Sequence, residues 1–398
     1  MNDQHILTIN GGSSSIKFAV FHLKPSLHRG LTGKLDRIGC DGTRLTFSET
    51  ERAAPQTVEV AAADHLAAAE FLLDWLESQN ILSNVAAIGH RIVHGMQRTQ
   101  PEIVTPEMLD ELHCICPYAA EHLPGELSII AAFRKHIPSV PQVVCFDTAF
   151  HRTMPRVATL LPIPRRYEAQ GLQRYGFHGL SYAYLIQELR RLGDPAAVSG
   201  RVILAHLGNG ASMAAVRNGQ CIDTSMAFTP SAGLPMGTRT GDLDPGLFHY
   251  LTQVEGMTPD QFHRMVNHES GLLGISETSS DMRDLLAIES SDFRAAEAIQ
   301  LFCYQAKKWI GAFVAALGGL DTLVFAGGVG ENSPGIRASI CRELQCLGIE
   351  LDEERNAENA SSISSKVSRV NVKVISTDEE IMIAHSVEEI VRRLDPSL

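Results

Sequence analysis

Two glycine-rich turns, about two hundred residues apart, constrain this chain more than any other feature of its sequence. The first is Asn10-Gly-Gly-Ser-Ser-Ser-Ile-Lys17, and the second is His206-Leu-Gly-Asn-Gly-Ala-Ser212. Apolar, β-type runs flank both turns: residues 6–9 and 16–21 surround the first, and residues 202–204 and 213–216 surround the second. The pattern predicts a unit of strand, glycine turn and strand that the chain uses twice.

Turns of this kind suit phosphate binding. Glycine has no Cβ, so it reaches φ > 0 and lets backbone N–H groups approach an anion closely. A flexible Gly/Ser linker is the alternative for the first turn. Linkers, however, are not usually held between apolar strands and followed at once by a lysine such as Lys17. Two such turns therefore predict a protein that could hold the two ends of a polyphosphate.

Length and composition indicate a globular protein of several domains. A chain of 398 residues with 44% hydrophobic residues is expected to form two or three domains, each with its own core. Its longest apolar stretches, such as residues 310–317, are far shorter than the roughly 18 residues of a membrane span. The N-terminus lacks the basic and apolar regions of a signal peptide. We therefore expect a cytoplasmic protein with no membrane partner.

The net charge of −12 argues against nucleic acid as a partner, because that binding depends on a basic surface. An anionic ligand must instead meet a local basic cluster, for which the candidates are Lys17, Arg91, Arg239 and Arg283. The eight cysteines form no CxxC pair and no His/Cys cluster at zinc spacing, so we expect no metal role for them.

Strand-like and helical runs alternate in both halves of the chain, which predicts an α/β fold. The first half shows a helical run at 61–79 and strands at 85–93 and 142–146, and a domain junction is expected near 147–155. In the second half a strand begins at Arg201. Apolar residues spaced three and four apart from Ile299 to Leu317 define one helix face, which Gly318 and Gly319 end.

A third glycine-rich segment follows the predicted strand at 322–326. We expect residues 327–332 to form a loop, with Ser333 as the N-cap and Pro334 as the first residue of a helix. This order of strand, glycine loop and helix is typical of nucleotide contacts. The polar residues 356–365 are expected to form a solvated loop, followed by a strand at 370–375 and a last helix at 381–394.

The common nucleotide-binding signatures do not occur in the sequence. It has no GxxxxGK[ST], no protein-kinase motif set and no GxGxxG that opens a Rossmann unit. The predicted phosphate site must then belong to a different nucleotide-binding fold.

Nine motifs, in order and over the whole length of the chain, resemble those of the acetate kinase family. They are Asn10-Gly-Gly-Ser-Ser-Ser-Ile-Lys17, Gly89-His-Arg-Ile-Val-His-Gly95, Cys145-Phe-Asp-Thr-Ala-Phe150, Arg174-Tyr-Gly-Phe-His-Gly179, His206-Leu-Gly-Asn-Gly210, Asp223-Thr-Ser-Met-Ala-Phe-Thr-Pro230, Gly233-Leu-Pro-Met-Gly-Thr-Arg239, Ser280-Asp-Met-Arg283 and Gly328-Val-Gly-Glu-Asn332. The resemblance implies two duplicated ribonuclease H-like α/β domains, as in actin-like ATPases and in acetate and sugar kinases, with an interdomain cleft. It implies an acyl-substrate-side domain of residues 1–148 and 382–398, closed by the C-terminal helix, and a nucleotide-binding domain of residues 149–381.

The resemblance also implies an activity: reversible, in-line transfer of a phosphoryl group from ATP to acetate, which gives acetyl phosphate and ADP with Mg²⁺ (or Mn²⁺), in a homodimer. Such transfer requires the protein mainly to position the reactants and to supply cations, and an arginine can bind a carboxylate or phosphoryl group in a bidentate manner. The implied catalytic residues are Arg91, Asp147, His178 and Arg239, and the implied metal ligands are Asn10 and Glu379.

By the same resemblance the acyl substrate contacts Arg91, Val93, His122, Phe177 and Pro230. The nucleotide contacts Lys17, His206, Leu207, Gly208, Asn209, Gly210, Asp281, Met282, Arg283, Gly328, Val329, Gly330, Glu331 and Asn332. For His122 a structural role is an equal alternative. Acetate is already ionised at neutral pH, so Asp147 can equally order Arg91 or the waters of Mg²⁺ as transfer a proton.

The chain departs from the family pattern near the acyl site. Met96 stands in place of a second glycine, and Leu180 and Tyr182 replace threonine and histidine. Glu121 takes the place of a leucine that lines the methyl pocket in relatives, with Leu123 two residues later, and it either faces that pocket or points away from it.

These departures keep other functions open. The first alternative is a kinase of another short-chain carboxylate, such as propionate or a hydroxy acid. The second is an actin-type or chaperone-type ATPase with no acyl substrate. A sugar kinase would use Asp147 as a base, but two arginines around the acceptor suit an anion better than a hydroxyl group.

Overall fold

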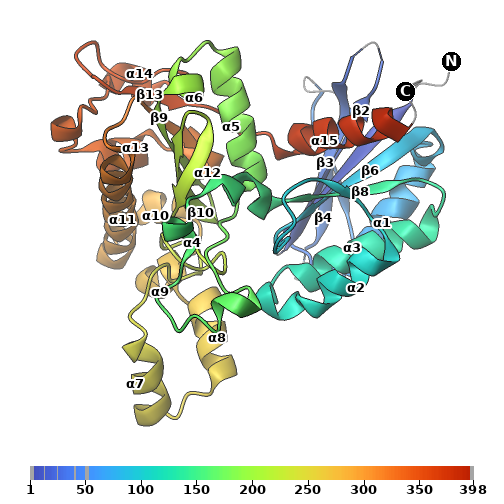
Figure 1. Ribbon diagram of the computed structural model, residues 1–398, viewed down its shortest axis with the longest axis horizontal. Coiled ribbons are helices and arrows are strands. Elements are labelled where there is room, and N and C mark those ends of the chain that lie inside the picture. Colours follow the sequence, from blue (N-terminus) through green and yellow to red (C-terminus); the bar gives the residue numbers. More distant parts are fainter. Residues whose placement is uncertain (1–3, 13, 25, 40–41, 50–52, 395–398) are drawn as a thin grey trace. The chain divides into compact units, whose positions relative to one another are not determined.

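The computed structural model describes residues 4–12, 14–24, 26–39, 42–49 and 53–394 (Figure 1). Ser13 of the first glycine turn and residues 395–398 of the predicted first domain lie outside these ranges. The chain forms two compact units. Unit 1 consists of Met1–Ala149 and Asp378–Leu398, and unit 2 consists of Phe150–Thr377.

The sheet of unit 1 has the strand order β5-β4-β3-β2-β1-β6-β8-β7. Its strands are β1 (His5–Gly11), β2 (Ser15–His22), β3 (His28–Asp36), β4 (Arg44–Ser48), β5 (Gln56–Glu59), β6 (Val85–Ile92), β7 (Glu102–Ile103) and β8 (Gln142–Phe146). β1 and β2 form the antiparallel hairpin around the first glycine turn, and β6 and then β8 continue the sheet in parallel. The strands predicted at 6–9, 16–21, 85–93 and 142–146 are confirmed.

Helices cover both faces of this sheet. They are α1 (His65–Ser78), α2 (Pro106–Cys114), α3 (Leu123–His136) and α15 (Glu379–Leu394), with 3₁₀ turns at Leu82–Asn84, Cys116–Tyr118 and Asp147–Thr153. α1 and α3 bury the face that contains Ile88. Side chains alternate along a strand, so the next residue, Gly89, faces α15. A Cβ at Gly89 would lie 2.4 Å from Ile383 and 2.6 Å from Val387, so glycine at this position lets the last helix pack closely on the sheet.

The sheet of unit 2 repeats the central strand order of unit 1. Its order is β11-β10-β9-β12-β13, built from β9 (Arg201–Leu207), β10 (Ala211–Arg217), β11 (Gln220–Thr224), β12 (Thr322–Ala326) and β13 (Asn371–Val374). As in β3-β2-β1-β6-β8 of unit 1, three antiparallel strands are followed by two parallel ones. The predicted duplication of an α/β unit around the two glycine turns is therefore confirmed.

The helices of unit 2 are α4 (Arg156–Thr159), α5 (Gly179–Arg191), α6 (Ala196–Ser199), α7 (Gly246–Val254), α8 (Pro259–His268), α9 (Gly271–Ser276), α10 (Met282–Ile288), α11 (Phe293–Leu317), α12 (Gly327–Asn332), α13 (Pro334–Cys341) and α14 (Glu353–Ala357), with 3₁₀ turns at Glu168–Gln170 and Gln345–Leu347. α5 and α11 lie on opposite faces of the sheet (Figure 1). α11 ends at Gly318, whose φ of 71° is left-handed, as the sequence predicted.

The glycine-rich segment after β12 differs from its prediction. Residues 327–332 form the helix α12, so the expectation of a loop is wrong. A Cβ at Gly327 would lie 2.7 Å from the backbone oxygen of Leu207, so glycine here serves close packing and a φ of 77°. Ser333 makes no capping hydrogen bond through its side chain, although Pro334 does begin α13.

The polar segment 356–365 is not simply solvated, which is a second correction. Asn356 is buried, and its side chain donates to the backbone oxygen of Pro334 and accepts a hydrogen bond from Arg337 Nε at 2.8 Å. Ile363 is buried as well. The polar residues of this segment therefore include partners for Arg337, whose side chain is itself fully buried.

None of the helices in the described part of the chain combines the length and the apolar character that a membrane-spanning helix requires.

Candidate active site

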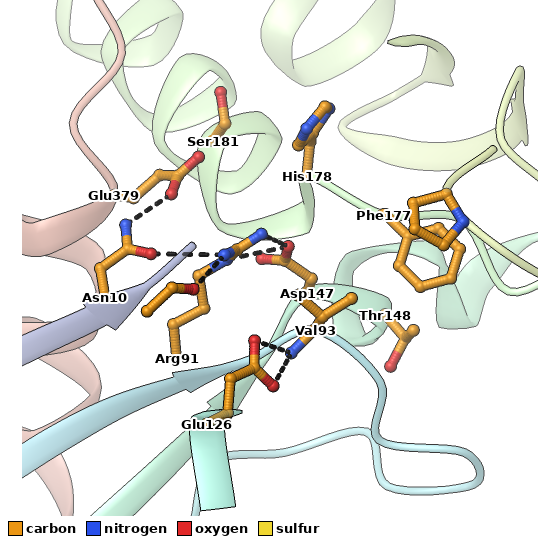
Figure 2. Close-up of polar contacts among 12 residues, drawn as sticks. Asn10, Arg91, Val93, Glu126, Asp147, Thr148, Phe177, His178, Ser181 and Glu379 are labelled. Atoms are coloured by element: carbon orange, nitrogen blue, oxygen red, sulfur yellow. Dashed lines mark hydrogen bonds and ion pairs between the residues drawn. The ribbon is translucent and has the colours of Figure 1, made fainter. Parts of the chain in front are cut away.

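In unit 1 the carboxyl ends of two neighbouring parallel strands bring Arg91 and Asp147 together (Figure 2). Arg91 Nη2 donates to Asp147 Oδ2 at 2.6 Å, and Arg91 Nε donates to the same oxygen at 3.0 Å. Asp147 directly follows β8 and is fully buried. Parallel strands end at the same edge of a sheet, and this edge is where open α/β sheets bind ligands.

The surroundings of Arg91 keep its guanidinium charged. Its Nη1 donates to the backbone oxygen of Gly11 at 3.0 Å and to Asn10 Oδ1 at 3.4 Å. Burial alone would lower the pKa of Arg91, but the acids Asp147, Glu379 and Glu126, together with the hydrogen bonds that Arg91 donates to Asp147, raise it above its ordinary value. A fixed, charged guanidinium suits the binding of a small carboxylate.

The two predicted metal ligands also meet in unit 1. Asn10 Nδ2 donates to Glu379 Oε2 at 2.9 Å (Figure 2). It also donates to Glu380 Oε1 at 3.1 Å. Lys17, which is exposed, is the cross-strand partner of Asn10 and lines a cavity of about 470 Å³ with Glu380. Amide and carboxylate oxygens are the donors that Mg²⁺ prefers, and the side chains of Asn10 and Glu379 carry these groups, so a magnesium role for them stays a prediction. Within the described residues no group of three or more His, Cys, Asp or Glu side chains could hold a metal.

Glu126 is a buried acid of this region that the sequence analysis missed. It lies in the first turn of α3 and accepts the N–H of Val93 at 3.3 Å and 3.1 Å through its two oxygens (Figure 2). Burial raises the pKa of Glu126 to about 8, against the opposing effects of Arg91 and of the Val93 hydrogen bond. A signal was present: Ile129, Ile130 and Phe133 follow it at the spacings of one helix face, so the acid lies on an apolar side of the helix.

The structure shows the setting of Glu121 and Met96, two positions at which the sequence departs from the family pattern. Glu121 is exposed to solvent, so the acid that lies beside Val93 is Glu126 and not Glu121. Met96 has a φ of 50°, a left-handed conformation that favours the glycine found in relatives. His122 precedes α3 at its N-cap position and makes no capping hydrogen bond through its side chain.

In unit 2 the predicted residues gather around the turn between β9 and β10. A Cβ at Gly210 would lie 2.9 Å from Arg239 Nη2 and 3.4 Å from His178 Nε2, so both side chains reach the turn. The rings of His178 and His206 stack with their centroids 4.3 Å apart. Arg239 Nη1 donates to the backbone oxygen of Pro230 at 2.7 Å. These groups form a cluster of donors beside the glycine turn.

A short chain of hydrogen bonds orients His178. Its Nδ1 lies 2.8 Å from Ser212 Oγ, which in turn is hydrogen-bonded to the hydroxyl of Tyr182. Ser212 and Tyr182 are fully buried, and Phe177, just before His178, is buried too. His178 has a left-handed φ of 58°, and strained backbone of this kind is often found at functional sites. Because Nδ1 is engaged by Ser212, Nε2 is the nitrogen that reaches Gly210.

The remaining predicted nucleotide residues lie around the same turn. A Cβ at Gly208 would lie 3.9 Å from the backbone nitrogen of Gly328, at the start of α12. A Cβ at Gly237 would lie 2.1 Å from Asn209 Oδ1 and 3.0 Å from the backbone oxygen of Ser280, which adjoins the predicted residues 281–283. The structure thus brings three separate glycine-rich or polar segments to the turn between β9 and β10, which follows Leu207.

Two of these segments are held by local hydrogen bonds. Asp281 caps α10 and pairs with Arg283 at 2.5 Å, while Met282 is buried behind them. Glu331 of α12 accepts the N–H groups of Gly327 at 2.8 Å and Thr377 at 3.1 Å. Val329, Gly330 and Asn332 are the other predicted nucleotide residues of α12. The nucleotide role of these residues stays a prediction.

A sequence model described as the acetokinase family matches residues 5–385. The chain belongs to this family. It is 43% identical to a propionate kinase of Citrobacter rodentium over 97% of this chain and 96% of that protein. It is also 43% identical to an acetate kinase of Methylocella silvestris over 95% of this chain and 96% of that protein.

Solved structures of the acetokinase family agree with the fold. The crystal structure of an acetate kinase from Porphyromonas gingivalis matches with a TM-score of 0.86 and 36% identity, over 98% of this chain and 100% of that one. The predicted fold class, a duplicated α/β fold of the acetate kinase type, is confirmed.

Proposed function

We propose that this acetokinase-family protein transfers the γ-phosphoryl group of ATP to a small carboxylate, reversibly, with acetate as its main substrate. The observation that carries the proposal is Arg91: a charged guanidinium fixed by Asp147 at the carboxyl edge of the unit 1 sheet. Propionate is the second candidate, because relatives that are equally similar to this chain include proteins named propionate kinase.

In the proposed reaction Arg91 binds the carboxylate of the acyl substrate, with Val93, His122, Phe177 and Pro230 as its other contacts. One carboxylate oxygen attacks the γ-phosphorus of ATP while the bond from that phosphorus to the β,γ-bridging oxygen breaks, and ADP leaves with that electron pair. The attacking group is ionised at neutral pH and needs no general base. We therefore assign Asp147 to holding Arg91 in place, as its hydrogen bonds to Nε and Nη2 support.

Unit 2 supplies the donors for the phosphoryl group in this proposal. His178 Nε2 and Arg239 would stabilise its equatorial oxygens, and the backbone of residues 207–210, with Lys17 and His206, would hold the other phosphates. Residues 281–283 and 328–332 would contact adenosine. Mg²⁺, held by Asn10 and Glu379, would neutralise phosphate charge. In these terms unit 1 forms the acyl-substrate side, and unit 2 forms the nucleotide-binding domain.

A homodimer is part of the proposal. α7 has no buried residue, and its apolar side chains are exposed by 41% at Leu247, 40% at Phe248 and 62% at Val254. Covering this face with a second copy would remove apolar surface from water. Sedimentation of the purified chain should give twice the monomer mass, whereas a monomer at micromolar concentration would contradict this part. The cytoplasmic location stays a prediction.

Trapping the product with hydroxylamine tests the function. The protein is incubated with MgATP and, in turn, acetate, propionate, butyrate and glycolate, and acyl hydroxamate is measured. We expect hydroxamate from acetate at the highest kcat/KM and from propionate next. Hydroxamate formed mainly from propionate or glycolate would favour the alternative substrate class. ATP hydrolysis without hydroxamate from any acid would contradict a carboxylate kinase and favour an actin-type or chaperone-type ATPase.

A further inference from the structure

Glu126 is a buried titratable group that the proposed mechanism does not use. Its side chain lies near the ends of two strands: both oxygens accept the N–H of Val93, which directly follows β6, and a Cβ at Gly11, the last residue of β1, would lie 3.6 Å from Glu126 Cγ. Only 4% of the residue is exposed. A carboxyl group in this position can affect the acyl site in two ways: through its hydrogen bonds to the backbone of Val93 and through its own charge.

The charged and titratable groups that face Glu126 come from several elements. Arg91 of β6 and Asp147, which follows β8, act on it directly, and Glu126 itself acts on Cys116 of the 3₁₀ turn before α3. His65 of α1 packs against Gly125, and His122 precedes the same helix. Asp147 already offsets the positive charge of Arg91. Glu379 acts on Arg91 too, so an ionised Glu126 would add further negative charge around the guanidinium.

We propose that Glu126 is a positioning residue of the acyl site, an inference that rests on the proposed function. As a neutral acid, Glu126 holds the Val93 amide and leaves Arg91 free to attract the substrate carboxylate. As a carboxylate, Glu126 weakens substrate binding. Two like charges close together in a poorly solvated site repel strongly, so ionised Glu126 opposes the entry of another anion.

The direction of the pH dependence follows from burial. Because burial raises the pKa of Glu126 to about 8, the group is mostly protonated at neutral pH and ionises as the pH rises through that value. Acetate stays ionised throughout this range. The KM for the carboxylate should therefore rise on the alkaline side. The bound complex favours protonated Glu126, so kcat should change less than KM.

The test measures KM and kcat for acetate, at saturating MgATP, from about pH 6.5 to about pH 9.5. For the wild-type protein we expect the KM for acetate to rise about tenfold above about pH 8, with kcat within about twofold. Glu126→Gln keeps an acceptor for Val93 but cannot ionise, and its KM should stay flat. The control Glu121→Gln changes an exposed acid of the same segment and should keep the wild-type profile.

Each failure has a separate signature. A wild-type KM that stays flat across the range would overturn the inference, and this measurement needs no variant to fold. A rise that persists in folded Glu126→Gln, as checked by circular dichroism, would overturn it too, because another group would then titrate. The loss of all carboxylate-dependent turnover in the wild-type protein would instead contradict the proposed function.

Discussion

The two units share a strand order but carry opposite chemistry at the same edge of their sheets. In unit 1, Arg91 lies among acids: it donates hydrogen bonds to Asp147, and the side chains of Glu379 and Glu126 lie close enough to influence its pKa. In unit 2, Arg239 donates to a neutral carbonyl oxygen, that of Pro230, and lies with His178 beside a glycine turn. The duplicated fold therefore carries an arginine paired with an acid in unit 1 and a cluster of hydrogen-bond donors in unit 2.

The difference indicates how a duplicated fold can divide the binding of two anions. A guanidinium balanced by carboxylates can hold a small monoanion and still lie next to the carboxylates of a metal site. Backbone N–H groups, imidazole and guanidinium gathered at one turn suit the higher charge of phosphates. The difference supports our proposal that the acyl anion binds at the Arg91 cluster (Asn10, Arg91 and Asp147) and the phosphoryl group at the Gly210 cluster (His178, Gly210 and Arg239).

Replacing the donor in unit 2 should give the largest effect. Arg239→Ala removes a guanidinium that would stabilise the transferring phosphoryl group, so kcat should fall by about 10²-fold or more. Steady-state kinetics with acetate and MgATP measure this loss. Arg191→Ala is the matched control, because this exposed arginine pairs with Glu188 of its own helix, and the substitution should leave kcat within about twofold. A loss below about tenfold for Arg239→Ala would undo the assignment of the Gly210 cluster.

Removing the charge of the acid that pairs with Arg91 in unit 1 should give the second largest effect. Asp147→Asn removes the charge that fixes Arg91, and its amide N–H groups compete with those of the guanidinium. We expect kcat/KM for acetate to fall about 30-fold and the free energy of unfolding to fall by about 3 kcal/mol, since breaking a buried ion pair leaves a buried charge. Urea denaturation and initial rates measure both. Asp110→Asn on the exposed side of α2 should change neither, and an Asp147 variant with wild-type kinetics would contradict the role given to Asp147.

A smaller effect is expected from the hydrogen-bond chain behind His178. Tyr182→Phe removes the hydroxyl that binds Ser212, so Ser212 can turn away from His178 Nδ1. We expect kcat to fall about fivefold, with the KM for ATP within about twofold, as the loss of about 1 kcal/mol from one hydrogen bond gives. Tyr184→Phe, two residues along α5, is the control. Equal kinetics for the two variants would contradict a role of Tyr182 in orienting His178.

The smallest effect concerns the stability of unit 1. Between about pH 4.5 and about pH 8 folded wild-type protein keeps a proton on Glu126 that the unfolded chain has lost, so its stability falls as the pH rises. Glu126→Gln has no such loss. The melting temperature of Glu126→Gln, relative to that of the wild type, should therefore rise by on the order of 5 °C from about pH 5 to about pH 8. Above about pH 8 this difference should stay constant. A difference that does not vary with pH would place the pKa of Glu126 in its ordinary range.

Sequence patterns predicted what depends on local chemistry. Both hairpins could be found because glycine turns lie between apolar runs, and Gly318 marked the end of α11. Gly327 misled because glycine also permits close packing: the constraint there is the backbone of Leu207, more than a hundred residues away in sequence. A contact of that kind leaves no local signal.

The site shows the same limit. Resemblance supplied Arg91 and Asp147, and the parallel pairing of β6 with β8 explains why they meet. Glu126 was missed because a glutamate on a helix is ordinarily solvated, and only its position on an apolar face marked it as buried. Glu121 stands at the pocket position of the family motif, yet its side chain is exposed. Which acid is buried depends on which side chains of this segment face the sheet.

The most direct test of the division between the units is acyl hydroxamate formation by Arg91→Gln. If Arg91 binds the acyl anion, ATP-dependent hydroxamate formation from acetate should fall about 10²-fold or more, mainly through KM for acetate, while the dissociation constant for MgATP stays within about threefold of the wild type. Unchanged hydroxamate formation, or an equal loss of MgATP affinity with acetate KM unaffected, would contradict the account.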